Sequence, residues 1–386
     1  MRGLIVVFWL GLICTLGCTA ENRPLKEEKV IPQTTTKSIT LVYPDDPNIQ
    51  FLGRWDKKHP LTPTAAYSAT GFRTYFFGDT LALAFFNKGY QKNKFNYLAI
   101  YIDDVEYPYL KITNSDSVYA IAGNLSDAYH KLEVRKRTES NVGKVTFKGM
   151  LVRADTTLQK PNPKKYFFEF VGNSITCGYG SEISVDDPKK FHFKPENENV
   201  MRSFASLTAK HFDADYHVVA YSGLGITRDY AGNRKNNMLK MYPKILPDDF
   251  SSRKDDSVYT NTDIVVVNLG TNDFISSTPN SSKFINDYLK LLFHIREKHP
   301  KSIIVCTGGT MISNTYPAGR HYRSMFKDLI LEVEKEFVRQ ADPYITHFFF
   351  EPHSAPYGED WHPSKLTHQK MANELIEFLK ELRDWH

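Results

Sequence analysis

The sequence predicts an α/β protein of two parts, in which an amino-terminal all-β jelly-roll sandwich precedes a flavodoxin-like three-layer domain with a mainly parallel sheet. Short apolar or alternating runs separated by turn residues fill residues 48–157 and show no helical period, which is typical of a β-sandwich. Beyond residue 166, apolar β-branched runs alternate with stretches of helical spacing, which indicates a parallel sheet covered by helices. The length of 386 residues, 41% of them hydrophobic, is sufficient for two such domains.

Residues 1–20 have the composition of a targeting segment. Arg2 supplies a positive charge ahead of an apolar run over residues 4–16, which is too short to span a membrane permanently. The run ends next to Cys18, as in a bacterial lipoprotein signal in which Cys18 is lipidated, and the alternative is ordinary signal cleavage after Ala20. Both outcomes predict an exported protein (an outer-membrane lipoprotein, periplasmic or secreted) whose membrane contact is limited to a lipid anchor at Cys18.

Charged and Thr-rich residues without periodicity occupy 21–47, and we expect them to form a tether. The β-sandwich follows over residues 48–157, and its expected strands cover 71–77, 81–86, 97–102 and 131–135. Residues 158–165 contain two prolines and predict a stiff linker. We expect no catalytic constellation of side chains ahead of this linker.

The domain predicted over residues 166–386 alternates strands with helices. A first strand ends at Gly172, and a β-branched run over 264–269 has the composition of a strand buried on both faces. The remaining elements are expected as helices over 201–212, 284–295, 322–337 and 371–382 and as strands over 216–220, 303–306 and 345–350. Cys177 and Cys306 lie beside apolar strands, so buried, unpaired thiols are favoured, although two cysteines of an exported chain can pair.

Polar residues follow the ends of several strands in this second domain. Ser174 follows the first strand, Gly223 the second and Asn272 the third, whereas Asp360 and His362 precede the last helix. The carboxyl ends of parallel strands share one edge of a sheet, so these residues can converge there. Together they supply a nucleophile, a backbone N–H, an amide donor, and a base with a carboxylate two residues before it. Acyl transfer through a serine requires this set of groups.

Each of these residues also has an ordinary structural explanation. Ser174 can cap a helix, Gly223 can serve a tight turn, Asn272 can bridge loop backbone, and His362 can be a surface residue. Their occurrence in order at the ends of successive elements favours the catalytic interpretation over four unrelated roles.

Four segments resemble the sequence blocks of the SGNH (GDSL-like) hydrolases, namely residues 172–176, 222–223, 270–273 and 360–363. The longer phrases over 173–180 and 220–226, together with the β-rich region ahead of them, resemble carbohydrate esterase family 2 over about residues 48–386. That family couples a jelly roll to an SGNH domain and removes acetyl groups from plant polysaccharides such as xylan and glucomannan. The resemblance therefore implies an acetyl xylan esterase-like serine esterase whose partner is an acetylated polysaccharide or oligosaccharide.

The resemblance also implies a catalytic role for each matching residue. Ser174 would be the nucleophile, and His362 would be the general base that takes its proton. Asp360 would orient the imidazole, with Glu359 as the alternative acid, because many members of the superfamily place the acid three residues before the histidine. Some esterases of this kind rely on the serine and the histidine alone.

The implied oxyanion hole comprises the N–H of Ser174, the N–H of Gly223 and the side chain of Asn272, with Gly225 as the alternative to Gly223. One residue departs from the family pattern, because Asn173 stands where an Asp usually precedes the serine. This position is normally structural, so we expect activity to survive the change.

Aromatic residues near these motifs can stack on sugar rings. Trp361 and Tyr179 are the predicted substrate-binding residues, and Trp55 of the sandwich is a further candidate. Trp and Tyr are more often partly buried in a core, which is the competing interpretation for each of them.

Composition and motifs argue against several other classes of function. The formal charge of +5 is mild for this length, and no basic cluster with interleaved aromatics predicts binding to nucleic acid. Neither the cysteine and histidine spacing of a metal site nor a dinucleotide or P-loop fingerprint occurs, so we expect no metal and no cofactor. We also expect a monomer. The alternatives to an esterase are a carbohydrate-binding protein with an inert hydrolase domain and an SGNH lipase or thioesterase.

Overall fold

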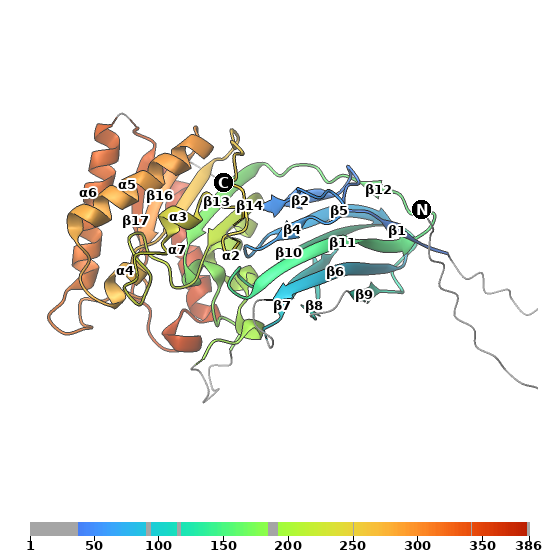
Figure 1. Ribbon diagram of the computed structural model, residues 1–386, viewed down its shortest axis with the longest axis horizontal. Helices are drawn as coiled ribbons and strands as arrows, with labels where there is room; N and C mark the ends of the chain where they lie inside the picture. The colour runs from blue at the N-terminus through green and yellow to red at the C-terminus, as the bar shows by residue number, and fades with distance from the viewer. Residues whose placement is uncertain are drawn as a thin grey trace, which may run out of the picture. The chain divides into compact units, whose positions relative to one another are not determined.

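The computed structural model describes residues 38–89, 94–113, 117–183, 192–249, 251–340 and 342–383. The targeting segment predicted over 1–20, the lipidation of Cys18 and residues 21–37 of the expected tether lie outside the described residues. Along the chain, a β-sandwich built from residues 39–159 is followed by an α/β region built from residues 166–383 (Figure 1). None of the described helices combines the length and the apolar character that crossing a membrane requires.

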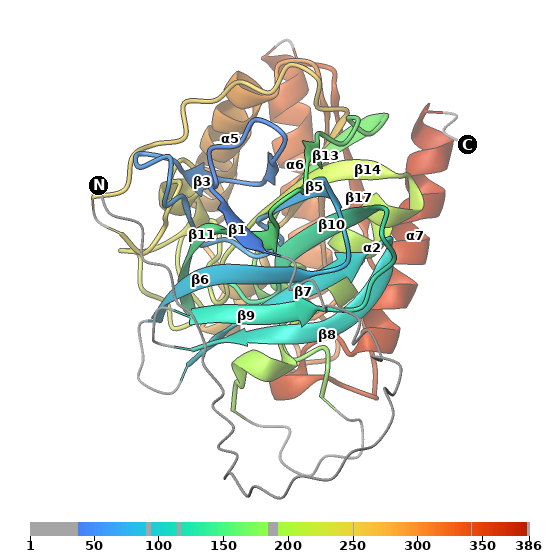
Figure 2. The same cartoon turned by 90° about the vertical axis from the view of Figure 1, so that its right-hand side faces the viewer.

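Antiparallel sheets form the β-sandwich, as predicted. The first runs in the order β3-β4-β11-β6-β9 with β1 beside β11, and Figure 2 shows β6 and β9 side by side. Its strands are β1 (Ile39–Val42), β3 (Trp55–Asp56), β4 (Thr64–Ala65), β6 (Leu81–Gly89), β9 (Ser117–Ala122) and β11 (Gly143–Arg153). The second runs in the order β12-β5-β10-β7-β8 with β2 beside β5. Its strands are β2 (Gln50–Leu52), β5 (Gly71–Phe77), β7 (Asn96–Ile102), β8 (Val105–Ile112), β10 (Tyr129–Lys136) and β12 (Leu158–Gln159).

Aromatic side chains fill the space between these two sheets. The Phe72 ring of β5 stacks on Phe147 of β11 with centroids 4.2 Å apart, and the Phe85 ring of β6 lies 5.2 Å from Phe147. All three side chains are buried, because alternate residues of each strand point into the sandwich. Burying a side chain of this size contributes about 1.5–3 kcal/mol, so this apolar contact holds the sheets together.

Strand β1 corrects the expected extent of the tether. Residues 39–42 fall inside the segment 21–47, yet they pair with β11, so that Ile39 lies opposite Arg153 and Val42 opposite Met150. Their β-branched and apolar side chains suit the edge of a sheet. Similarly, β12 lies inside the linker expected over 158–165 and pairs with β5.

A parallel sheet in the order β14-β13-β15-β16-β17 forms the centre of the α/β region. Its strands are β13 (Tyr166–Gly172), β14 (Ala214–Ala220), β15 (Ile264–Asn268), β16 (Ile303–Gly308) and β17 (Ile345–Phe349). The helices are α1 (Ser174–Cys177), α2 (Phe204–His211), α3 (Met238–Met241), α4 (Thr271–Ile275), α5 (Ser281–Lys298), α6 (Tyr322–Arg339) and α7 (Lys365–Arg383). Short 3₁₀ segments occur at Pro195–Asn197, Val200–Arg202 and Glu359–Trp361. The predicted parallel three-layer arrangement is confirmed.

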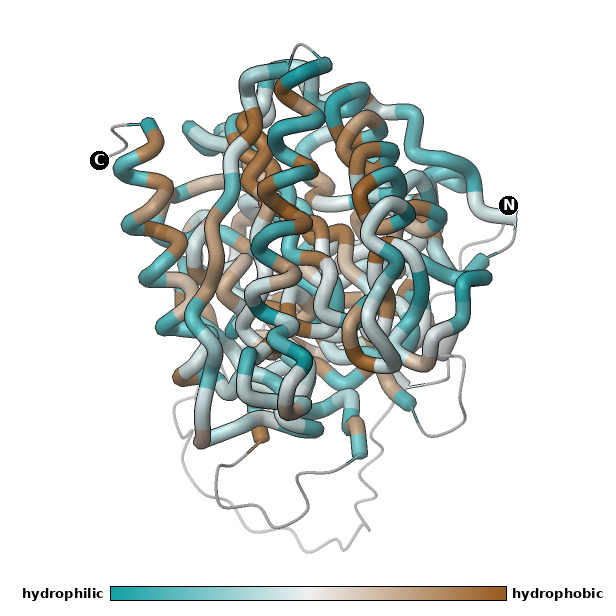
Figure 3. Tube along the Cα trace, turned by 90° about the vertical axis from the view of Figure 1, so that its left-hand side faces the viewer, coloured by the Kyte–Doolittle hydropathy of each residue, from teal (hydrophilic) through white to brown (hydrophobic). Residues whose placement is uncertain are grey.

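Helices cover both faces of this sheet. Val265 and Val267 of β15 belong to an apolar cluster with residues of α5 and α6, whereas Ile264 and Val266 belong to a cluster with residues of α2 and α7. Successive residues of a strand point to opposite faces, so a strand between two helical layers must be apolar throughout. Hydrophobic and hydrophilic stretches alternate along the helices in Figure 3, since each helix buries one side only.

Both cysteines of the α/β region are buried free thiols. Cys177 lies in α1 and Cys306 in β16, and neither forms a disulfide. Burial raises the pKa of both thiols, that of Cys306 to about 12, so neither is a nucleophile at neutral pH.

A buried arginine joins the β-sandwich to the α/β region. The Arg54 guanidinium lies 3.6 Å from the Glu169 carboxylate of β13 and 3.1 Å from that of Asp255, and it also donates to the Tyr242 carbonyl. Arg54 and Glu169 are almost fully buried, so water cannot solvate either charge if its partner is removed.

Replacing Arg54 should therefore destabilise the protein strongly. Arg54→Ala removes the guanidinium beside the buried Glu169 carboxylate, which keeps only its contacts with Tyr242 and His299, and we expect the free energy of unfolding, measured by urea denaturation, to fall by about 3–5 kcal/mol. Lys58→Ala, four residues away and exposed, is the matched control and should change that free energy by less than about 0.5 kcal/mol. Equal effects of the two substitutions would contradict this assignment.

Candidate active site

A cavity of about 450 Å³ lies at the carboxyl ends of the parallel strands. It is lined by Lys94, Asn141, Ser174, Tyr179, Phe193, Ser222, Gly223, Tyr230, Thr271, Asn272, Ile275, Met311, Asp360 and His362. The set includes the predicted nucleophile, the predicted base and the predicted oxyanion residues, so the structure brings together segments far apart in the sequence. Lys94 and Asn141 come from the β-sandwich, for which the sequence predicted no residue of the site except Trp55, and Trp55 does not line this cavity.

A tight turn after β13 places Ser174 at the carboxyl edge of the sheet, in the wall of the cavity. Strand β13 ends at Gly172, and α1 begins at Ser174 after a single residue. The Asn173 side-chain oxygen accepts the Ile175 N–H at 3.1 Å and so caps the helix. A Cβ on Gly172 would lie 2.0 Å from Thr176 Oγ1, so only glycine permits this tight strand-to-helix turn. The Asn that departs from the family pattern thus has a structural function here.

Ser174 and His362 form a hydrogen bond across the edge of the sheet. Ser174 Oγ lies 2.8 Å from His362 Nε2, although 188 positions separate the two residues. The other ring nitrogen, Nδ1, lies 3.0 Å from the Glu359 carbonyl oxygen. A carbonyl can only accept, so Nδ1 carries the proton and Nε2 is left as the acceptor for the serine hydroxyl. This arrangement is the geometry of a nucleophile and its general base.

The His362 ring is held in a poorly hydrated environment. The Tyr179 ring stacks on it with centroids 4.1 Å apart and planes inclined by 26°. Burial lowers the pKa of His362 to about 4, and the hydrogen bond to the Glu359 carbonyl opposes this only in part. The imidazole is therefore neutral near pH 7, as a general base must be before it takes a proton.

Asp360, the acid predicted to support the histidine, directs its carboxylate elsewhere. Its oxygens accept the Tyr179 hydroxyl at 2.7 Å and the His192 N–H at 3.2 Å. The backbone of Asp360 is in the left-handed region with φ +48°, and this turn presents the preceding carbonyl, rather than the carboxylate, to the His362 ring. The Asp360 carboxylate is thus linked to the base by contact only through the tyrosine that stacks on the ring, although its negative charge also raises the pKa of His362.

Glu359, the alternative acid, contributes its main chain instead of its carboxylate. The carboxylate is fully buried and accepts hydrogen bonds from Asn197 Nδ2 at 2.5 Å and from the Lys194 N–H at 3.3 Å. Burial raises the pKa of the Glu359 carboxyl. The role of its carbonyl could not be read from the sequence, because every residue type offers the same backbone oxygen.

Gly180 allows the histidine loop to approach the nucleophile. A Cβ on Gly180 would lie 2.5 Å from the Glu359 Cβ, whereas Gly178, with φ +74°, ends α1 and faces the Asn199 backbone. The Glu359 N–H is within 3.4 Å of the Gly180 carbonyl, which ties the two segments directly. The contact between Gly180 and Glu359 therefore sets the distance between the serine and histidine segments.

The predicted oxyanion donors face the same cavity. Gly223 has φ +79°, and a Cβ there would lie 2.9 Å from the Tyr230 ring. One amide hydrogen of Asn272 Nδ2 is donated to the Leu224 carbonyl at 2.9 Å, which fixes the side chain and leaves the second hydrogen for a ligand. Among the described residues, no acceptor takes the N–H of Ser174 or of Gly223. Three donors are thus in place around one cavity.

Gly225, the alternative to Gly223, has a different function. Its N–H is donated to the Arg228 carbonyl at 2.8 Å, and a Cβ would lie 2.2 Å from Asp273 Oδ2. Asp273 in turn accepts the N–H groups of Ile226 and Thr227, both at 2.8 Å, and is fully buried. The Asp273 carboxylate therefore holds the backbone of the loop that contains Gly223, which the sequence alone did not predict.

The three aromatic candidates differ in position. Trp361 is 59% exposed beside the base, whereas Tyr179 packs on His362 and also lies 4.7 Å from the Phe193 ring. Trp55 is only 8% exposed, and its ring N–H lies within hydrogen-bonding distance of carbonyls inside the sandwich. Trp55 is thus a core residue and not a sugar platform.

The contacts of Asp360 lead to a test of its role. Asp360→Asn preserves an acceptor for the Tyr179 hydroxyl and leaves the Glu359 carbonyl in place, so we expect kcat/KM for p-nitrophenyl acetate to fall by less than about tenfold, against about 10⁴-fold for loss of a triad aspartate. His362→Ala is the control and should lose nearly all activity. A loss of about 10⁴-fold in Asp360→Asn would mean that this carboxylate supports the base directly.

The low pKa of His362 predicts the acid limb of the activity profile. Only the neutral ring accepts a proton, so activity is present above the pKa and is lost as pH falls through it. We expect kcat/KM to be level at neutral pH and to reach half its plateau at about pH 4. Circular dichroism at each pH separates this limb from acid unfolding. A midpoint near 6.5 in a folded protein would contradict the buried environment of the ring.

Comparison with known proteins agrees with this fold. The family model described as "Carbohydrate esterase 2 N-terminal" matches residues 51–161, and that described as "GDSL-like Lipase/Acylhydrolase family" matches residues 170–370. The cellulase/esterase CelE of Acetivibrio thermocellus is 33% identical over 344 residues, which are 88% of this chain and 40% of the relative. An acetylxylan esterase / glucomannan deacetylase of Cellvibrio japonicus is 23% identical over 92% of this chain and 94% of that protein.

A solved structure gives the same result. A family two carbohydrate esterase from Clostridium thermocellum, in complex with cellohexaose, superposes with a TM-score of 0.79 and 31% identity, covering 88% of this chain and all of that one. The strand-end serine, the loops at the sheet edge and the histidine before the last helix place the chain in the class of GDSL-like hydrolases. With its amino-terminal β-sandwich, the chain belongs to carbohydrate esterase family 2.

Proposed function

We propose that this protein is a serine esterase that removes O-acetyl groups from plant cell-wall polysaccharide, such as xylan or glucomannan, through an acyl-enzyme. The observation that carries the proposal is the 2.8 Å contact of Ser174 Oγ with a neutral His362 in a cavity with oxyanion donors. The chain spans 40% of the length of CelE, so the proposal concerns the esterase reaction and not the other activity in that protein's name.

In the first half of the proposed reaction, Ser174 Oγ attacks the acetyl carbonyl carbon while its proton passes to His362 Nε2. The negative oxygen that forms is stabilised by the N–H groups of Ser174 and Gly223 and by Asn272, each typically worth about 3–4 kcal/mol in the transition state. When this intermediate collapses, the C–O bond to the sugar breaks, and the sugar oxygen takes the proton from His362. Acetyl-Ser174 remains.

In the second half, water attacks the acetyl group and gives its proton to His362. The new intermediate releases acetate, and the proton returns to Ser174 Oγ, so that the enzyme is unchanged. The Glu359 carbonyl supports the imidazolium of each half-reaction as an uncharged acceptor, and the Asp360 carboxylate lies beside it without direct contact.

The rim of the cavity suits a carbohydrate. Tyr230 lines the cavity and is 59% exposed, and Trp361 is equally exposed next to His362. Exposed aromatic rings offer flat apolar faces with a polar edge, on which a sugar ring can stack. We therefore retain Trp361 and Tyr179 as proposed substrate contacts, Trp361 by its exposed ring and Tyr179 by its position in the cavity wall.

Acetate release tests the proposed function. Wild-type protein should liberate acetate from acetylated xylan or glucomannan, Ser174→Ala should liberate none, and Asn272→Ala should lower kcat by about 10²–10³-fold because one oxyanion donor is lost. Asn261→Ala, which removes an exposed amide in the turn before β15 and outside the cavity, is the matched control and should retain full activity.

The same assay separates the alternatives. Binding of polysaccharide with no turnover of any ester would indicate a carbohydrate-binding protein with an inert hydrolase domain. Preference for long acyl chains over acetate in p-nitrophenyl esters would indicate a lipase or thioesterase.

We further infer export to the cell envelope or medium from the composition of residues 1–20, with a lipid anchor at Cys18 as the form of membrane attachment. A polysaccharide substrate is extracellular, which is consistent with this location. We also propose that the protein acts as a monomer, because the described residues of one chain supply every group named in the reaction.

A further inference from the structure

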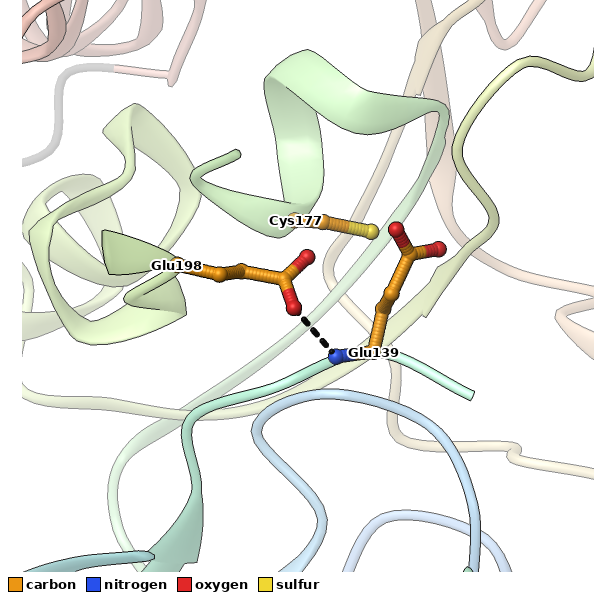
Figure 4. A group of neighbouring side chains, drawn as sticks. All are labelled: Glu139, Cys177 and Glu198. Atoms are coloured by element: carbon orange, nitrogen blue, oxygen red, sulfur yellow. Dashed lines mark hydrogen bonds between the residues drawn. The ribbon is translucent and has the colours of Figure 1, made fainter. Parts of the chain in front are cut away.

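Three buried side chains from separate segments form a cluster near the active site, and the loop that joins β10 to β11 contributes one of them. Glu139 of this loop, Cys177 of α1 and Glu198 have ligand atoms within 4.8 Å of one another, and all three residues are fully buried (Figure 4). By residue type the group resembles a metal site. However, burial raises the pKa of both carboxyl groups, that of Glu198 well above its usual range, and so disfavours the negative charge that would hold a cation.

The contacts of the Glu139 carboxylate point toward the oxyanion hole instead. One oxygen, Oε2, accepts the backbone N–H of Ser222 at 2.7 Å, and Oε1 accepts Asn141 Nδ2 at 2.9 Å. Ser222 directly precedes Gly223, and both Ser222 and Asn141 line the cavity. A side chain of the β-sandwich thus bonds to the peptide immediately before the proposed oxyanion donor.

The main chain of Glu139 is anchored on two further sides. Its N–H is donated to Glu198 Oε2 at 2.9 Å, which Figure 4 shows as a dashed line, and its carbonyl accepts Lys136 Nζ at 2.9 Å. Lys136 also donates to the Thr138 carbonyl at 2.7 Å. Both backbone groups of Glu139 are hydrogen-bonded, so this residue is held in place. Its carboxyl group can therefore fix the position of the Ser222 N–H.

We propose that Glu139, contributed by the β-sandwich, is a positioning residue that fixes the Ser222–Gly223 backbone and thereby aims the Gly223 N–H at the developing oxyanion. The proposal rests on the proposed esterase function. A buried hydrogen bond from an N–H to a carboxylate is short and strong, and an oxyanion donor must be held to within about 0.5 Å to be effective.

This contact adds to the hydrogen bonds that the α/β region makes with the same loop, in which the Tyr230 N–H is donated to the Gly223 carbonyl at 2.8 Å. Asp273 clamps the far end of the same loop through Ile226 and Thr227, beyond Gly223. Glu139 holds the near end through Ser222, so Gly223 lies between two buried carboxylates on either side. On this proposal, the β-sandwich contributes Lys94 and Asn141 to the cavity wall and also positions the Gly223 N–H through Glu139.

The test separates positioning from simple stabilisation. Glu139→Ala removes the acceptor of the Ser222 N–H, and we expect kcat for p-nitrophenyl acetate to fall by about tenfold or more while KM stays within about twofold, because only transition-state binding is weakened. Glu139→Gln retains an amide oxygen for the Ser222 N–H, and we expect it to recover kcat to within about threefold of wild type.

Glu133→Gln provides the matched control. Glu133 is a carboxylate of β10 that bonds Arg135 Nε at 2.8 Å and lies outside the cavity, so this variant should retain kcat whatever its thermal midpoint. If Glu139→Ala fails to fold, Glu139→Asp replaces it, since the shorter side chain keeps the carboxyl group but withdraws its oxygen from Ser222, and the same loss of kcat is expected.

Two results would overturn the proposal. One is a folded Glu139→Ala or Glu139→Asp variant with wild-type kcat. The other is a loss of kcat in Glu139→Gln as large as in Glu139→Ala. Wild type and Ser174→Ala are assayed alongside, so absence of turnover in the wild type would reject the esterase function itself rather than the role of Glu139.

Discussion

The hydrogen bond between Ser174 and His362 depends on the parallel sheet beneath it. Strand β13 delivers the serine at its carboxyl end, and the histidine arrives from the loop before α7, at the same edge. Neither segment can place its side chain alone. The serine needs the Gly172 turn and the Asn173 cap, and the histidine needs the close approach at Gly180. Both positions are glycines, because a Cβ on Gly172 would collide with Thr176 in the turn, and a Cβ on Gly180 would force the two segments apart.

An uncharged carbonyl, rather than a carboxylate, orients the base. The Glu359 carbonyl fixes the tautomer of His362 as well as an acid would, because it accepts the Nδ1 proton. It offers less electrostatic support to the imidazolium, and burial is then free to lower the pKa of the ring to about 4. A base of low pKa is fully neutral at pH 7 but is a weaker proton acceptor. In the proposed mechanism, the oxyanion donors accordingly supply a large part of the rate acceleration.

Much of the fold and of the candidate site could be predicted from the sequence, and physical reasons explain why the other features could not. The β-sandwich, the parallel sheet and its helices follow from period-two and period-3.6 patterns. Ser174, Gly223 and Asn272 follow from their positions at strand ends, and His362 follows from its position before the last helix. The carbonyl of Glu359 could not be found, because it depends on a backbone turn at Asp360 and not on a residue type. Contacts between the β-sandwich and the oxyanion loop were also missed, since each links residues distant in sequence and carries no local pattern.

The direct test of the central claim is covalent labelling of the nucleophile. Incubation with diethyl p-nitrophenyl phosphate, followed by mass analysis of peptides, reports which hydroxyl is activated by a neighbouring base. The account predicts a single diethylphosphoryl group on Ser174, formed at a rate that falls strongly in His362→Ala. Labelling at another residue, or labelling of Ser174 at the same rate without the imidazole, would contradict it.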